Sequence, residues 1–307
     1  MKRWLFTLLI LFTLLPLCSC YRHYQIEDDD FTPHIVLHSL VQADSLMHLS
    51  LSRSWLTGET PADTLSGAAV TLWINGKSRE FGTAVPHRGD HLRLRVEAEG
   101  LPAVEAETVV PHRVKIDSLR CRRSDRSDIE VQVELAFQDP VGRSNFYGLG
   151  FYSRKNKFYG DHFILDISKE PLFAPLQELG VLDDVVSWSD FYYYGNLLPF
   201  SDLNIDGQTY TLNVAFRNWM GDELDEVLVC LYTFSDSYYL YLLSLLRLGI
   251  NVLSDYGLAD PNLVYTNVAD GLGIFAACQM DTVHLSLESI RGTIDNAVSR
   301  PAREAAQ

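Results

Sequence analysis

The sequence lacks every common catalytic signature. Its 307 residues contain no HExxH histidine pair, no serine in a GxSxG elbow and no complete glycine-rich phosphate loop. Carboxylates are numerous, but no recognisable motif pairs them. A glycoside hydrolase needs only two carboxylates that the fold brings together, so the sequence leaves enzyme activity unsupported without excluding it. We therefore expect a protein that works without catalysis and without a cofactor.

Basic residues are scarce. There are 25 lysines and arginines against 40 aspartates and glutamates, which gives a formal net charge of −15. Nucleic-acid binding depends on a basic surface that neutralises phosphates, so this balance argues against such a partner. It argues equally against a basic surface that lies on a membrane. The strongly negative charge favours solubility.

Cysteine is also rare, with five residues and no CxxC spacing. Neither a zinc site nor a disulfide framework is predicted. Two of the five lie near the amino terminus, which leaves Cys121, Cys230 and Cys278 for the body of the protein. Cys230 and Cys278 sit in apolar runs that are typical of buried free thiols. A single Cys230–Cys278 bridge stays open at this point.

The first twenty residues have the make-up of a secretory leader. Lys2 and Arg3 precede an apolar run from Trp4 to Leu17. A permanent membrane span needs about 20 apolar residues, so this run is too short for one. The segment Leu17–Cys20 (LCSC) resembles the lipobox of bacterial lipoproteins, which implies cleavage before Cys20 and its lipidation. Ordinary secretion with cleavage nearby is the alternative.

The polar composition of residues 20–33 predicts a solvated linker between the membrane and the folded part of the chain. Loss of residues 1–19 removes Lys2 and Arg3 and no acids, leaving 23 basic against 40 acidic residues and a charge of −17. The acidic cluster at residues 27–30 (EDDD) resembles the surface-export signal of Bacteroidetes lipoproteins, which predicts outward display on the outer membrane. A charged linker without an addressing role is the alternative.

Residues 34–112 show short alternating runs with turn signals, a pattern that predicts a small immunoglobulin-like β-sandwich. The run His91–Glu99 alternates strictly between apolar and charged residues. Asn75-Gly76 between two strand-like runs is a strong hairpin signal, because both turn positions need positive φ. A further strand is predicted at Ser45–Ser54.

The pattern of residues 113–290 predicts a larger β-rich domain with one helix. The clearest strand is Ile129–Phe137, which alternates again. Near the end of the domain, separate strands are predicted at Leu263–Val268, Leu272–Cys278 and Thr282–Leu287. Residues 291–307 form a polar tail that we expect to be frayed.

The one clear helix begins at Ser235, where Ser235 and Asp236 are both good N-cap residues, and runs to Leu248. Gly249 then suits the position just past the last turn. The helix is apolar on nearly every face, which predicts that it is largely buried against a sheet.

Asp202, Asn204 and Asp206 have the spacing of the first half of a calcium loop. The second half fails, because the twelfth position is Asn213 where a bidentate glutamate is needed. A hairpin turn whose side chains cap the backbone, with Gly207 at positive φ, explains the segment more simply. A weak calcium site is the alternative.

Trp188, Tyr192 and Tyr194 are the ligand-contact candidates. They lie in an aromatic-rich segment between loop signals. Exposed aromatic side chains in a loop can bind sugars or apolar peptides. A strand with Tyr192 facing outward and its neighbours Phe191 and Tyr193 inward is the alternative.

The order and spacing of several motifs resemble the DUF4249 family of Bacteroidetes lipoproteins. The most specific are PFSDLNIDG (Pro199–Gly207), the helix start Ser235–Tyr241 and VYTNVADGLGIFAA (Val264–Ala277), with the AxVTLWING hairpin (Ala68–Gly76) in support. The resemblance covers nearly the whole mature chain. It implies an outer-membrane lipoprotein whose gene neighbours a TonB-dependent transporter, and it brings no catalytic residues.

We therefore expect a mostly β lipoprotein, anchored through Cys20 in the outer membrane and facing outward. The expected role is that of a non-catalytic binding or accessory partner of a TonB-dependent transporter in nutrient uptake. An adhesin-like or envelope-structural module would instead present an exposed, unpaired edge strand in residues 34–112. A surface hydrolase, the less favoured alternative, would need carboxylates that converge in a cleft.

Overall fold

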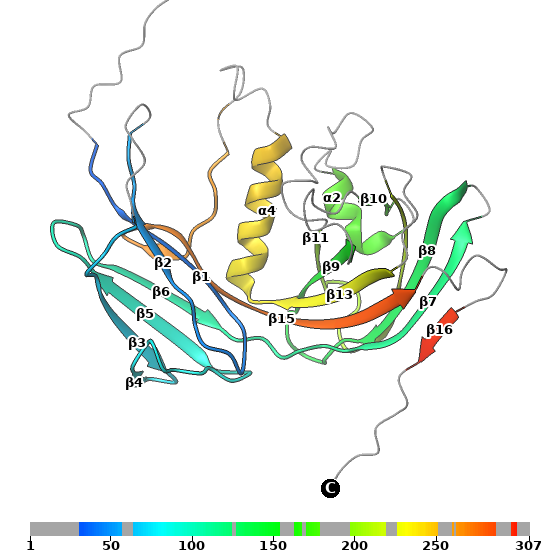
Figure 1. Cartoon of the computed structure of the whole chain (residues 1–307), viewed down its shortest axis with the longest axis horizontal. Coiled ribbons are helices and arrows are strands. Elements are labelled where there is room, and N and C mark those ends of the chain that lie inside the picture. Colours follow the sequence, from blue (N-terminus) through cyan, green and yellow to red (C-terminus); the bar gives the residue numbers. More distant parts are fainter. Residues whose placement is uncertain are drawn as a thin grey trace, which may run out of the picture. The chain divides into compact units, whose positions relative to one another are not determined.

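The structure is a computed structural model. It describes residues 31–56, 64–124, 127–153, 163–167, 170–178, 197–218, 226–250, 260, 262–286 and 296–299. Residues from Pro33 onward form one compact unit. Strands dominate the described part of this unit and form three sheets, which confirms the prediction of a mostly β protein (Figure 1).

The three sheets draw on strands from all parts of the sequence. The six-stranded sheet has the order β11 (Leu197–Ser201), β9 (Phe146–Ser153), β13 (Glu226–Phe234), β15 (Leu272–Ser286), β1 (Ile35–Val41) and β2 (Ser50–Arg53). The β8 sheet has the order β10 (Phe163–Asp166), β12 (Thr209–Asn218), β8 (Ser127–Gln138), β7 (Ile116–Ser124) and β16 (Asn296–Ser299). The β5 sheet has the order β14 (Val268–Ala269), β6 (Val104–Val109), β5 (His91–Glu97), β3 (Ala69–Ile74) and β4 (Lys77–Arg79).

The β5 sheet follows the local sequence pattern. Leu92, Leu94 and Val96 of β5 are fully buried, as their alternation predicts. Asn75 and Gly76 adopt φ of 51° and 75° between the paired strands β3 and β4, which confirms the predicted hairpin. The buried face of this sheet packs against β1, β2 and the first part of β15 to form the N-terminal core. Each fully buried leucine there contributes about 1.5–3 kcal/mol.

A second core lies between the β8 sheet and strands β9, β11, β13 and β15 of the six-stranded sheet. It is rich in aromatic side chains. The rings of Phe137 and Tyr147 lie 5.2 Å apart, and those of Phe173 and Phe200 lie 5.3 Å apart. Phe173 belongs to a 3₁₀ helix (Pro171–Phe173) that continues into α2 (Ala174–Glu178).

Strand β15 belongs to both cores. Its first residues run parallel to β1, from Leu272 opposite Val36, and its later residues run antiparallel to β13 as far as Ser286 opposite Glu226. Phe275 points into the N-terminal core, and further along the same strand Val283 points into the second. Figure 1 shows β15 passing from β1 beneath α4 towards β7 and β8.

The prediction of two separate strands at Leu272–Cys278 and Thr282–Leu287 is wrong, because β15 runs unbroken through Gln279 and Asp281. Both polar side chains are buried, and they lie on the same face as the core residues on either side of them. Asp281 Oδ2 accepts a hydrogen bond of 2.9 Å from Ile116 N. The polar residues therefore mark the point where the connection from β6 to β7 crosses the strand.

Helix α4 (Asp236–Ile250) packs on the outer face of the six-stranded sheet. Its N-cap is confirmed, since Ser235 Oγ accepts hydrogen bonds from Tyr238 N at 3.4 Å and Ala277 N at 3.0 Å. The helix continues through Gly249 to Ile250, two residues past the predicted end. A side chain rather than the glycine caps the last turn, because Asn262 Nδ2 donates to Arg247 O at 2.8 Å.

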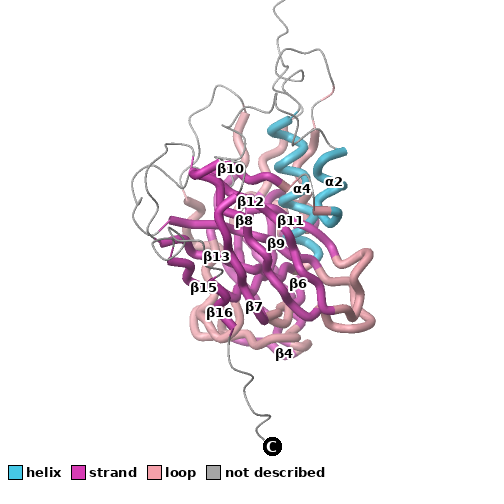
Figure 2. The backbone as a smooth tube through the Cα atoms, turned by 90° about the vertical axis from the view of Figure 1, so that its right-hand side faces the viewer, coloured by secondary structure: helices cyan, strands magenta, loops and turns pink. Residues whose placement is uncertain are grey.

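The helix is less buried than its composition predicts. Leu242 and Leu246 are buried, whereas Leu240 and Leu248 are exposed by 42% and 40%. In Figure 2, α2 and α4 lie together on one side of the strands. No helix in the described segments is long and apolar enough to cross a bilayer.

Two other segments differ from expectation. Only Ser50–Arg53 of the predicted strand at residues 45–54 pairs in a sheet. The chain leaves the sheet beforehand, because Asp44 adopts a φ of 60° and its N–H bonds Pro86 O at 2.8 Å. In the tail, Asn296–Ser299 pair with β7 instead of fraying. The outer edge of β7 offers backbone groups that this short strand satisfies.

The strand register settles the question of the Cys230–Cys278 bridge. Cys230 lies opposite Thr282, and Cys278 lies opposite Phe234. The two cysteines are thus four positions apart along the ladder, roughly 13 Å. Disulfides need Cα atoms within about 7 Å, so both thiols, like that of Cys121, are free and buried.

Gly273 gives a first test of the shared strand. Its φ is 99°, and a Cβ atom there would collide with the carbonyl group of Leu37 on the paired strand β1. The variant Gly273→Ala should lose more than about 3 kcal/mol of unfolding free energy in urea denaturation. Gly82→Ala, where a Cβ meets nothing within 4 Å, should change it by less than about 1 kcal/mol. Equal midpoints for the two variants would contradict the register of β15.

The thiols give a second test. Burial raises the pKa of Cys121 to about 12 and that of Cys278 to about 11, and it also raises the pKa of Cys230. Because the reactive thiolate is disfavoured, the folded protein should resist alkylation of these cysteines at pH 8. After denaturation, the number of titratable thiols should be the same with and without prior reduction. Two additional thiols after reduction would reveal a disulfide.

Candidate functional site

The predicted site residues fall into two groups. The lipidation residue Cys20 and the aromatic candidates Trp188, Tyr192 and Tyr194 lie outside the described segments. The calcium candidates Asp202, Asn204 and Asp206 lie in the connection between β11 and β12. This connection crosses from the six-stranded sheet to the β8 sheet.

A second crossing connection, from β8 to β9, packs against the first. Three carboxylates hold the two connections together, and we call them the carboxylate lock: Asp139, Asp202 and Asp206. Each accepts a hydrogen bond from a backbone N–H of the opposite connection: Gly207 N to Asp139 Oδ2 at 2.8 Å, Asn145 N to Asp202 Oδ2 at 2.6 Å and Gly142 N to Asp206 Oδ1 at 2.8 Å. Gly207 has a φ of 68°, as the turn prediction requires.

The lock is partly buried and electrostatically strained. Asp139 and Asp202 are buried, whereas Asp206 is exposed. Burial raises the pKa of Asp202, and the negative charges of Asp139 and Asp206 act in the same direction, against the N–H donors of Asn145. Tyr147 donates its hydroxyl hydrogen to Asp139. Burial, followed by this hydrogen bond, raises the pKa of Tyr147.

Asp139, Asp202 and Asp206 are also the described residues that come closest to a metal site. Each offers a carboxylate oxygen, and these oxygens all lie within 4.8 Å of one another. Asn204, which the sequence pattern included, lies in the same connection as Asp202 and Asp206. The carboxylates already bind backbone amides, so we assign the lock a structural role that matches the predicted capping turn.

The other buried carboxylates of the described segments are used in the same way. Glu170 accepts hydrogen bonds from Asn213 N at 2.7 Å, Leu172 N at 3.3 Å and the hydroxyl of Tyr210 at 2.6 Å. Asp281 accepts from Ile116 N. A buried N–H without a partner costs about 1–3 kcal/mol, so these acids stabilise the backbone at Asn213, Leu172 and Ile116.

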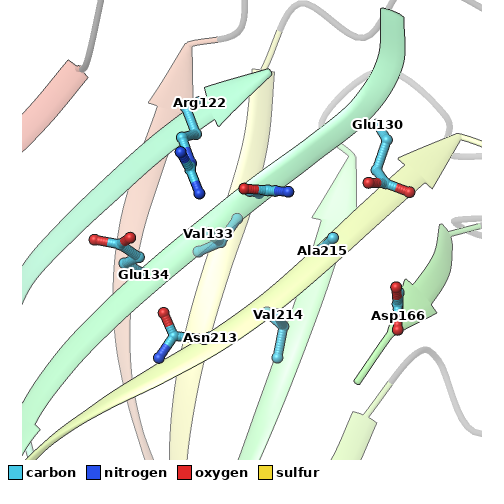
Figure 3. A pocket seen from close by; sticks show the side chains of 9 residues that line it. Arg122, Glu130, Val133, Glu134, Asp166, Asn213, Val214 and Ala215 are labelled. Atoms are coloured by element: carbon cyan, nitrogen blue, oxygen red, sulfur yellow. The ribbon is translucent and has the colours of Figure 1, made fainter. Parts of the chain in front are cut away.

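Within the described part of the chain, a polar hollow of about 340 Å³ is a candidate binding site. It lies on the outer face of the β8 sheet, away from the second core. Its lining consists of Arg122, Glu130, Gln132, Val133, Glu134, Asp166, Asn213, Val214 and Ala215, most of which are labelled in Figure 3.

The strand register explains where the hollow lies. Arg122 of β7, Gln132 of β8, Ala215 of β12 and Asp166 of β10 are successive cross-strand partners and form one row. Ala215 is the smallest side chain of this row, so the surface sinks between its longer neighbours. Figure 3 shows Arg122 and Asp166 on opposite sides of Ala215.

Sequence reasoning missed the hollow, although part of its signal is visible. The alternation of Ile129–Phe137 places Glu130, Gln132 and Glu134 on the face opposite the buried Val133 and Leu135. Their neighbours Arg122, Ala215 and Asp166 come from strands whose register the sequence does not contain. The polar face was therefore predictable, and the hollow was not.

These features define a mostly β protein with two cores that share one strand, a structural carboxylate lock and a polar hollow. Residues 21–283 match the family model described as domain of unknown function (DUF4249). The match spans most of the chain, and the protein belongs to this family. No curated protein and no solved structure matches the chain.

The carboxylate lock yields a stability prediction. In Asp139→Asn, the amide group would face donors such as Gly207 N and the Tyr147 hydroxyl, leaving at least one donor without an acceptor. We expect a loss of about 2 kcal/mol of unfolding free energy at pH 7. Asp206→Asn, at an exposed position that accepts one hydrogen bond, should lose less than about 1 kcal/mol. Chemical denaturation measures both losses. Equal losses in the two variants would contradict the larger contribution of Asp139 to the stability of the lock.

Proposed function

We propose that this protein is an outer-membrane lipoprotein that works without catalysis, as a binding or accessory partner of a TonB-dependent transporter in nutrient uptake. The observation that carries the proposal is the leader that ends in LCSC, with Cys20 as the residue that receives the lipid. A chain held at a membrane by its amino terminus acts close to that membrane. The transporter is the partner implied by the resemblance to Bacteroidetes lipoproteins.

The region after Cys20 supports outward display. Residues 20–33 are polar and contain the acidic cluster at residues 27–30. Such a linker keeps the folded part at a distance from the lipid headgroups. The net charge of −17 without the leader further disfavours close contact with an anionic membrane surface. The folded part is then free to meet a partner at the outer surface.

The use of the buried acids supports a role without catalysis. In the described segments, Asp139, Glu170, Asp202 and Asp281 are buried, and each bonds a backbone N–H. A hydrolase needs carboxylates aimed at a substrate. Three acids line the hollow, Glu130, Glu134 and Asp166, but Figure 3 shows them spread around its sides.

The structure gives no support to an adhesin that works by strand addition through the β5 sheet. The edge strand β4 has three residues, all exposed, and includes Lys77 and Arg79. Short, charged edge strands disfavour pairing with another chain.

The role is tested by affinity purification of the tagged full chain, solubilised in detergent from its native outer membrane. A TonB-dependent transporter should co-purify in stoichiometric amount. Cys18→Ala is the matched control, because Cys18 leaves with the leader and its loss should change nothing. Cys20→Ala should lose palmitate labelling, membrane association and the transporter together. Clean recovery of the lipidated protein alone would refute the accessory role.

A further inference from the structure

Arg122 and the two glutamates of the hollow are not paired with one another. In the described part of the chain, the side chains of Arg122, Glu130, Gln132 and Glu134 make no hydrogen bond or ion pair, although they lie on neighbouring strands. Gln132 and both glutamates are half-buried, so part of their surface is already withdrawn from water. Such groups gain from a ligand that supplies the missing partners.

The outer face of the β5 sheet shows what a stabilising arrangement looks like in this protein. There, Arg93 Nη2 lies 2.6 Å from Glu105 Oε2, and Arg95 Nη1 lies 2.8 Å from Glu105 Oε1. These contacts raise the pKa of both arginines and lower the pKa of Glu105. The β8 sheet carries similar side chains in Arg122, Glu130 and Glu134, and among the described residues it leaves these three unpaired around a hollow.

The one guanidinium of the hollow lies at one end, and two of its three acids lie at the other. In Figure 3, Arg122 and Glu134 are on one side, and Glu130 and Asp166 are on the other. The row from β7 to β10 covers three strand spacings, roughly 14 Å between backbones. An extended dipeptide spans at most about 7 Å and a tripeptide about 10 Å. The long side chain of Arg122 points over the hollow in Figure 3 and shortens the distance that a ligand must span.

The middle of the hollow suits peptide groups. The amides of Gln132 and Asn213 can both donate and accept hydrogen bonds, as a peptide N–H and C=O require. None of the described residues that line the hollow is aromatic, which disfavours the ring stacking by which sugars are often held. A volume of about 340 Å³ is at the lower end of the range for ligand pockets, roughly 300–1,000 Å³.

We infer that the hollow binds a short peptide, with the peptide carboxylate at Arg122 and its ammonium group between Glu130 and Asp166. The lining carries three carboxylates against one guanidinium, so it favours a peptide with a basic side chain over one with an acidic side chain. This inference concerns the chain alone and does not depend on the transporter. Binding measured without any transporter therefore tests it separately from the proposed function.

The test is isothermal titration of the detergent-solubilised full chain at low ionic strength with the dipeptide alanyl-lysine. Alanyl-lysine should bind. Acetylation of its α-amino group or amidation of its carboxylate should each weaken binding at least about tenfold, since each change removes a charge-assisted contact. Alanyl-glutamate should also bind at least about tenfold more weakly, because its extra charge is repelled.

Two variants and one control variant test where the peptide binds. Ala215→Leu fills the hollow and should abolish binding, whereas Thr211→Leu, an exposed position on the same face of β12, should leave it unchanged. Arg122→Gln should weaken binding of the free dipeptide at least about tenfold. The same change should leave the affinity for the amidated dipeptide unaltered, which a purely structural role of Arg122 would not produce.

Several results would overturn the inference. One is the absence of binding at an alanyl-lysine concentration of about 10 mM. A dissociation constant above this concentration would be too weak for a specific binding site. Equal binding of blocked and free dipeptides would exclude recognition of the termini. Unchanged binding in Ala215→Leu would place the peptide elsewhere, and tighter binding of a neutral disaccharide than of alanyl-lysine would identify a sugar site.

Discussion

The structure depends on one strand that belongs to two cores. The register of β15 is fixed on one edge by β1 and on the other by β13. A shift of one position would turn every side chain of the strand to the other face. Phe275 would then leave the N-terminal core at the same time as Val283 left the second. The two cores are therefore coupled through the backbone, even though different sheets close them.

The shared strand is crossed by other parts of the backbone, whose N–H groups need hydrogen-bond acceptors. Buried acids supply most of these acceptors. Where the chain crosses β15 and enters β7, side chains accept hydrogen bonds from two backbone amides. Asp281 accepts from Ile116 N, and Thr233 Oγ1 accepts from Val114 N at 3.3 Å. The carboxylate lock does the same for the two connections that cross between the sheets of the second core. Since buried N–H groups must find acceptors, the crossing points account for three buried acids of the described segments: Asp139, Asp202 and Asp281. The fourth, Glu170, accepts from Asn213 N within β12.

The features predictable from sequence are those decided by neighbours in the chain. The Asn75-Gly76 turn, the alternation in His91–Glu97 and the Ser235 cap depend on local dihedral and burial preferences, and all are found. The unbroken β15 was mispredicted because Gln279 and Asp281 resemble a turn when only their polarity is considered. Their burial depends on a connection more than a hundred residues away in the sequence.

The same limit applies to the sites. The sequence pointed to Asp202 and Asp206, but their partner Asp139 comes from another connection and could not be inferred. The spacing of Cys230 and Cys278 likewise left a bridge open until the register separated them. The hollow is the extreme case, because four strands contribute one side chain each to its central row. Cross-strand neighbours of this kind can be identified only when the order and register of the strands are known.

Ala215 raises a question that stability does not answer. Alanine is among the weaker strand formers, and β-branched or aromatic residues fit a pleated, half-buried surface better. A larger side chain at this position would cover Gln132 and fill the space before Asp166, its two cross-strand partners. It would also add the cross-strand contacts by which sheets gain about 0.2–1 kcal/mol per pair. The alanine instead leaves a hollow, at whose edge Arg122 and Glu130 do not pair with each other. A sheet face shaped only for stability would resemble the ion-paired face of the β5 sheet, so the open face of the β8 sheet is better explained by a ligand.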